Sequence, residues 1–181
     1  MKIVIVGCGR VGATLAGDLD GRGHEVIVID QVTSAFDRLP ASFGGQAIRA
    51  DGTDEDSLLR AGAGTADVFL ALTEGDNRNV MAAQLAAEAL GIEKVVAKIN
   101  DPVRAEAYAA LGIATICRTE LMDRALLESM GLPPGDLPGY RAAAPHEHPM
   151  TGSPAPAPAS VPATTADAPA GSASAVSGRE G

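Results

Sequence analysis

The short segment "GCGRVG", Gly7 to Gly12, constrains the fold of this chain more than any other feature. It follows the apolar run "KIVIV" and precedes a helical pattern over residues 10–19. Glycine tolerates left-handed backbone and lets neighbouring segments approach closely. A strand, a glycine turn and a helix in this order are typical of the first unit of a parallel α/β sheet. A glycine turn with a purely structural role is the alternative.

Short apolar runs alternate with helical patterns through residue 132. The runs of strand length are "KIVIV", "EVIVI", "QAIRA", "DVFLAL", "KVVAKI" and "ATIC". Helical stretches lie between them, at residues 10–19, 33–39, 54–61, 76–90 and 102–111. Such alternation builds parallel sheets with helices on both faces. We therefore expect an α/β fold: a Rossmann-type doubly wound parallel sheet with strand order 3-2-1-4-5-6.

Local signals mark where these helices begin and end. Glycines just past the helical stretches predict left-handed residues at the helix ends, and these are Gly21, Gly62, Gly91 and Gly112. Hydroxyl residues at the starts of two helices, Thr53 and Thr119, suit helix caps.

The composition changes near residue 140. The stretch "SPAPAPASVPATTADAPAGSASAVSG" has few large apolar residues, so it buries too little surface to offset the entropy of ordering. We expect a Rossmann domain over residues 1–118, a terminal helix over 119–132, and a linker with a disordered tail over 133–181.

The charge balance restricts the partners. A formal net charge of −9 argues against a nucleic-acid surface and against direct binding to an anionic bilayer. No run approaches the roughly 20 apolar residues of a membrane helix. The two cysteines, Cys8 and Cys117, have no metal-binding spacing. We expect a reduced, cytoplasmic protein without a metal site.

The glycine loop predicts a phosphate-bearing ligand. Gly7 would make the tight turn, Gly9 would let a pyrophosphate approach, and Gly12 would let the helix pack on the strands. Free N–H groups at the helix start would then face the anion. Arg10 opposes the helix dipole unless a phosphate binds there, the alternative being an idle surface residue.

Asp30 ends the second apolar run, where a carboxylate can accept hydrogen bonds from ribose hydroxyls and would repel a 2′-phosphate. This favours NAD or an adenine nucleotide over NADP, with a solvated acid as the alternative. Other candidates follow later strands, at the edge where ligands bind in such sheets: Asp51, Gly52, Thr73, Glu74 and Lys98. Ordinary surface charge is the alternative for Glu74 and Lys98.

The sequence offers little catalytic chemistry. No histidine lies at the carboxyl end of a predicted strand, and Tyr108 has no lysine four residues later. We expect no enzyme. The terminal helix carries apolar residues at helical spacing, which favours a partner subunit over complete burial in its own domain: Leu121, Met122, Ala125, Leu126 and Met130.

The segments "GCGRVG", "DGTDEDSLLRAG" and "LTEGDNRN" together resemble the nucleotide-binding N-terminal domain of regulators of potassium conductance, as in the Trk and Ktr potassium uptake proteins. Members of that family are cytoplasmic gating subunits that bind NAD(H), ADP or ATP, and they assemble as dimers and rings beneath a membrane channel or transporter. The resemblance implies that Arg10 senses a terminal phosphate and that residues 119–131 form a crossover helix on the dimer partner. It implies phosphate, ribose, adenine and lining contacts at Gly7, Cys8, Gly9, Arg10, Val11, Asp30, Asp51, Gly52, Thr73, Glu74 and Lys98.

We therefore expect a cytoplasmic regulatory subunit of a potassium uptake system that binds NAD(H) or ATP/ADP. It would form homo-oligomers and act at the membrane through an integral-membrane potassium channel or transporter. The alternatives are an NAD-dependent oxidoreductase with a separate substrate domain and a sensor of the NADH/NAD ratio.

Overall fold

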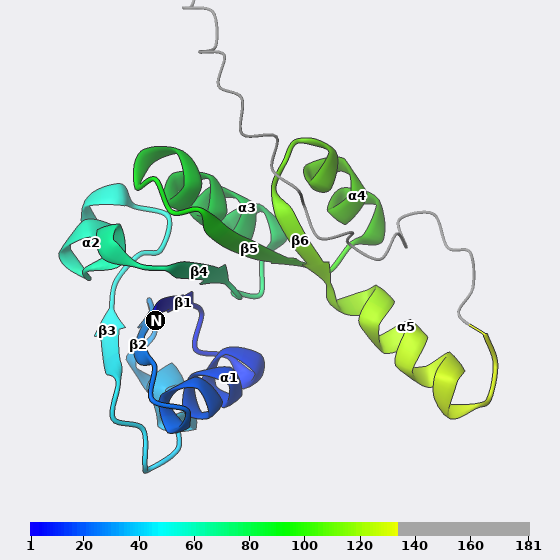
Figure 1. Ribbon diagram of the computed structural model, residues 1–181, viewed down its shortest axis with the longest axis horizontal. Coiled ribbons are helices and arrows are strands. Elements are labelled where there is room, and N and C mark those ends of the chain that lie inside the picture. Colours follow the sequence, from blue (N-terminus) through cyan, green and yellow to red (C-terminus); the bar gives the residue numbers. More distant parts are fainter. Residues whose placement is uncertain (134–181) are drawn as a thin grey trace, which may run out of the picture. The chain divides into compact units, whose positions relative to one another are not determined.

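The structure of this chain is a computed structural model that describes residues 1–133 (Figure 1). One parallel sheet has the order β3-β2-β1-β4-β5-β6. Its strands are β1 (Lys2–Val6), β2 (Glu25–Asp30), β3 (Gln46–Arg49), β4 (Val68–Ala71), β5 (Lys94–Ile99) and β6 (Ala114–Cys117). The predicted fold class and strand order are confirmed.

Helical segments connect consecutive strands, and one further helix follows the last strand. They are α1 (Arg10–Gly21), α2 (Glu55–Arg60), α3 (Asp76–Gln84), α4 (Pro102–Ala110) and α5 (Arg118–Ser129), with the 3₁₀ segments η1 (Thr33–Arg38) and η2 (Ala63–Thr65). The stretch predicted as one helix over 76–90 changes to a π-helical segment, η3 (Leu85–Ala89). There the N–H of Leu90 donates to the carbonyl of Leu85 at 3.1 Å, which widens the last turn.

Helix ends follow the predicted signals only in part. Gly62, Gly91 and Gly112 are left-handed, as predicted. Gly21 is not: α1 runs through it, and the left-handed residue is Gly23, with a φ of 82°.

The predicted hydroxyl caps are wrong. The carboxylate of Asp54 caps α2 by accepting from the N–H of Ser57 at 2.9 Å. The hydroxyl of Thr53 donates to Asp51 instead, and that of Thr119 donates to the carbonyl of Asn100.

Two apolar cores cover the two faces of the sheet. On one face, α2, α3 and α4 pack their buried residues against the strands. On the other, α1 and η1 cover β1 and β2 through Ala13, Ala16 and Ala35. These alanines let both helical segments lie close to the sheet, so the glycine loop is fixed at the carboxyl end of β1.

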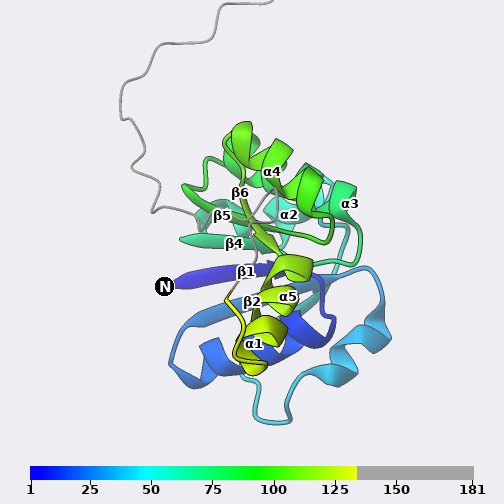
Figure 2. The same cartoon turned by 90° about the vertical axis from the view of Figure 1, so that its right-hand side faces the viewer.

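Helix α5 projects from the β6 edge of the sheet (Figures 1 and 2). None of its residues is buried. The alternative in which its own domain absorbs this helix is therefore wrong. The second sheet face is also only partly covered toward β6, where Ile116 is 47% exposed.

The expected tail lies outside the described residues, and the three expected domain ranges stay predictions. No helix within residues 1–133 combines the length and hydropathy that crossing a bilayer requires.

Candidate functional site

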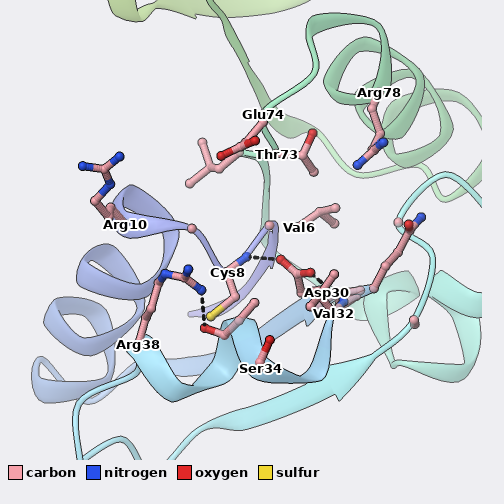
Figure 3. Close-up of a pocket in the computed structure, with 18 residues that line it drawn as sticks. Val6, Cys8, Arg10, Asp30, Val32, Ser34, Arg38, Thr73, Glu74 and Arg78 are labelled. Atoms are coloured by element: carbon pink, nitrogen blue, oxygen red, sulfur yellow. Dashed lines mark hydrogen bonds between the residues drawn. The ribbon is translucent and has the colours of Figure 1, made fainter.

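A cleft of about 380 Å³ opens at the carboxyl ends of β1, β2 and β4 (Figure 3). Predicted site residues that line it are Gly7, Cys8, Gly9, Arg10, Asp30, Gly52, Thr73 and Glu74. The sheet order brings them together, because β1 lies between β2 and β4 and all three strands point the same way.

Gly7 and Gly12 are required by close packing inside the protein. Gly7 has a φ of 107°, and a Cβ there would lie 2.7 Å from the backbone nitrogen of Thr73. A Cβ on Gly12 would overlap the carbonyl oxygen of Gly7. These contacts press the start of α1 against the turn, as the glycine pattern predicts.

Gly9 has a different environment. Its φ is −75°, which any residue adopts, and a Cβ there would meet no atom within 4 Å. Helix α1 begins at this point without a side-chain cap and without an acid in its first turn. The loop therefore offers open space and N–H donors at a positive helix end, which fit a phosphate group.

The carboxylate of Asp30 is held at the floor of the cleft. One oxygen accepts from the N–H of Cys8 at 2.7 Å, and the other accepts from the N–H of Val32 at 2.9 Å (Figure 3). An ionised carboxylate has about four acceptor positions. Asp30 therefore ties the glycine loop to β2 and keeps acceptor capacity for a ligand hydroxyl.

Cys8 contributes its backbone to the site. Its side chain is fully buried in the core beneath α1. Burial, and second the nearby Asp30 carboxylate, raise the pKa of the Cys8 thiol, while the Arg38 guanidinium opposes them. The thiol is thus protonated at neutral pH and is a poor nucleophile.

Asn79 holds the β4 side of the cleft in place. It is fully buried, and its amide oxygen accepts from the N–H of Thr73 at 2.8 Å and from the Thr73 hydroxyl at 2.6 Å. Its amide nitrogen donates to the carbonyls of Thr73 and Lys98 at 3.0 and 2.7 Å. One side chain thus joins the ends of β4 and β5 to α3.

Four predicted site residues do not line the cleft: Val11, Gly12, Asp51 and Lys98. The Asp51 carboxylate accepts from the N–H and hydroxyl of Thr53 at 2.9 and 2.7 Å, and these bonds lower its pKa. Burial, and then the Arg118 charge, lower the pKa of Lys98. Gly52 lines the cleft, but its small size also has a packing reason, because a Cβ there would overlap the Val6 side chain.

More than half of the residues that line the cleft were not predicted from the sequence. The additional lining residues are Val6, Ile29, Gln31, Val32, Ser34, Ala35, Arg38, Ala50, Leu72 and Arg78. Arg78 stands inside the quoted "LTEGDNRN" segment, two residues into α3, so helical phase could have indicated it. Arg38 ends the 3₁₀ segment η1, whose phase differs from that of an α-helix and gave no comparable signal.

The sequence of this domain matches a known family. Residues 3–119 match the family described as the TrkA-N domain. The chain belongs to the TrkA-N domain family. This match covers the sheet and the whole lining of the cleft, and it confirms the resemblance drawn from the glycine loop and the two later segments.

Relatives of this TrkA-N chain are named for potassium uptake. It is 45% identical over 141 residues to the Trk system potassium uptake protein TrkA of Streptomyces coelicolor, covering 78% of this chain and 63% of that protein. It is 33% identical over 130 residues to a Trk system potassium uptake protein TrkA homolog of Methanothermobacter thermautotrophicus, covering 72% and 60%. The chain thus spans under two thirds of these relatives.

Solved structures agree on the fold. The TrkA-N domain of the Escherichia coli inner membrane protein ybaL has a TM-score of 0.63 and 19% identity, covering 71% of this chain and 96% of that one. The Shewanella denitrificans Kef CTD in AMP bound form has a TM-score of 0.58 and 21% identity, covering 72% and 82%.

Proposed function

We propose that this chain is a regulatory subunit of a potassium uptake system and that its cleft binds NAD(H), ATP or ADP as a signal. The 45% identity to a Trk system potassium uptake protein supports the system, and that relative is not named as an enzyme. The uncapped start of α1 beside Asp30 supports the ligand, because it pairs anion donors with a ribose acceptor.

Arg10 is the candidate sensor of ligand charge. It stands in the first turn of α1, lines the cleft and is exposed. Its charge is unfavourable beside the positive helix end until a phosphate binds. A nucleotide would act on a membrane channel or transporter only by binding two arrangements of the subunits unequally.

The exposed apolar face of α5 supports assembly into a homodimer or a larger ring. In this proposal the assembly is cytoplasmic, and a membrane channel or transporter attaches it to the membrane. Apolar residues on α5 and at its C-cap are more than half exposed in the part of the chain that the structure describes: Leu121, Met122, Leu126 and Met130. The same chain leaves its second sheet face partly open near Ile116. A second copy would supply a cover for both surfaces.

Titration calorimetry of the full chain with ATP, ADP, AMP, NADH and NAD tests this proposal. We expect saturable binding of at least one compound, and expect Arg10→Ala to reduce the preference between ATP and ADP more than it reduces adenosine affinity. Absence of any binding, or steady consumption of NADH with a carbonyl substrate, would overturn the proposal. AMP is included because one fold neighbour is described as AMP bound.

A further inference from the structure

Three arginines from separate elements line the cleft. Arg10 comes from α1, Arg38 from η1 and Arg78 from α3 (Figure 3). The ion pairs within residues 1–133 lie elsewhere, at Lys2–Glu25, Arg60–Asp54, Arg104–Asp101 and Arg124–Glu128. Among the residues that the structure describes, no carboxylate forms an ion pair with these three arginines of the cleft.

Arg38 is placed beside the glycine loop. Its side chain is exposed, and its one hydrogen bond within the described residues runs to the Ala35 carbonyl at 3.4 Å, near the outer limit for such a bond. After burial, the charges of Asp30 and Arg38 both affect the pKa of the Cys8 thiol: the Asp30 carboxylate raises it and the Arg38 guanidinium lowers it. In Figure 3, the Cys8 segment of the loop lies between Arg38 and Asp30, and Arg38 lines the cleft from η1, whereas Arg10 leaves the loop along α1.

We propose that Arg38 is a second phosphate-binding residue, which contacts the phosphate next to the ribose. The inference rests on the proposed nucleotide site. With a ribose held at Asp30, the phosphate attached to it would lie between Asp30 and the open space at Gly9. Arg38 lies beside the Cys8 segment that joins these two points (Figure 3), and a guanidinium can give two parallel hydrogen bonds to one phosphate.

This position predicts a binding pattern distinct from that of Arg10. A residue that contacts the first phosphate acts equally on AMP, ADP, ATP and NAD, because each has a phosphate there. A residue that contacts the terminal phosphate separates ATP from ADP. Adenosine lacks phosphate, so substitution of either arginine should leave the affinity for adenosine unchanged.

The test is calorimetry of the full chain with adenosine, AMP, ADP, ATP and NAD. Arg38→Gln should lower the affinity for every phosphorylated compound that binds by about ten- to a hundredfold, which is the range expected for one charge-assisted hydrogen bond. Adenosine affinity should stay within about twofold, and Arg38→Lys should restore part of the loss.

Arg22→Gln is the matched control. It removes the same charge from the far end of α1, about 18 Å along the helix axis. It should leave all affinities unchanged.

The outcomes separate the two proposals. If the unaltered chain binds nucleotides and the Arg38→Gln variant binds AMP and ADP as tightly as the unaltered chain, the Arg38 assignment is wrong while the nucleotide site stands. The assignment also fails if Arg38→Gln lowers the affinity for adenosine as much as the affinity for AMP, since Arg38 would then act by positioning Asp30. If the unaltered chain binds none of the five compounds, both proposals fall.

Discussion

Gly9 and Gly12 belong to one loop and are glycines for different reasons. Gly12 has backbone oxygen where a Cβ would stand, whereas Gly9 faces open space. The first is a requirement of the fold, and the second is a requirement of whatever approaches the loop.

Alanine substitutions should therefore separate folding from binding. Gly12→Ala should lower the free energy of unfolding by about 2 kcal/mol or more, because the overlap forces α1 away from the turn. Gly9→Ala should change stability by less than about 0.5 kcal/mol and weaken nucleotide binding at least tenfold, because its methyl group fills the phosphate space. Urea denaturation and calorimetry of each variant measure both quantities. Full nucleotide affinity in Gly9→Ala would contradict the assignment of that space.

Asn79 is the residue whose loss should loosen the cleft wall most. Asn79→Ala leaves the N–H of Thr73 and the carbonyl of Lys98 without their partner. Each buried group left without a partner costs about 1–3 kcal/mol, so the two groups together predict a loss of about 2–6 kcal/mol in urea denaturation. Asn77→Ala, at an exposed position of α3, is the control and should be nearly neutral. An equal loss in both variants would show that α3 depends on asparagine for another reason.

At this scale the sequence predicted the residues whose chemistry is local. The glycine loop and Asp30 are recognisable because their spacing follows from one strand, turn and helix. Asp51 and Lys98 were placed only by strand end, and their side chains depend on Thr53 and on strand phase, which the sequence did not settle. Arg38 and Arg78 reach the cleft only through the packing of η1 and α3 beside β1.

Among the elements, α5 differs from every other helix because it has no buried residue. The other α-helices within residues 1–133 each bury at least one side chain against the sheet. The sequence predicted the apolar face of α5 by its spacing, but only the structure shows that the face is left open.

A charge on that face should disrupt assembly without unfolding the domain. Leu126, which is 55% exposed, should tolerate Leu126→Glu in the monomer, while the dimer should dissociate because a carboxylate would be buried at its interface. Light scattering measures the mass, and thermal melting reports the domain. Leu59→Glu, at an exposed position of α2, is the control and should keep the oligomeric mass. A wild-type chain that is already monomeric would contradict the dimer.

At the scale of the whole molecule, one partly buried acid links stability to pH. An oxygen of Glu120 is buried without a hydrogen-bond partner within the described residues. Burial, and then the Glu106 charge, raise the pKa of Glu120 above its usual 4.5. The folded chain thus holds this proton more tightly than the unfolded chain, so its stability falls as pH rises through that range.

Glu120→Gln should accordingly raise stability at pH 7 by at most about 1 kcal/mol, because it removes the charge of a partly buried carboxyl group and solvent screens part of that charge. Below pH 4 the gain should vanish, since the native carboxyl is then neutral. Melting temperatures at both pH values, at one protein concentration, measure this. Exposed Glu88→Gln should show no such pattern, and a gain that persists at low pH would contradict the assignment.

The overall architecture was predictable because its signals repeat along the chain. Each strand is a short apolar run, and each connection has helical spacing, so strand order follows from a few topological rules. Local irregularities were not predictable: η1 is a 3₁₀ segment, and α3 ends in a π-helical turn. Both depend on how a short segment meets the sheet.

The bare surface of α5 has a consequence for the order of the helix itself. Twelve residues, none of them buried, are too few to hold a stable helix in water by helix formation alone. In the proposed dimer, the formation of this helix would be coupled to contact with the second subunit. Dilution of that dimer should unfold α5 while the sheet stays intact. The concentration of the chain would then set the fraction of molecules in which α5 is folded.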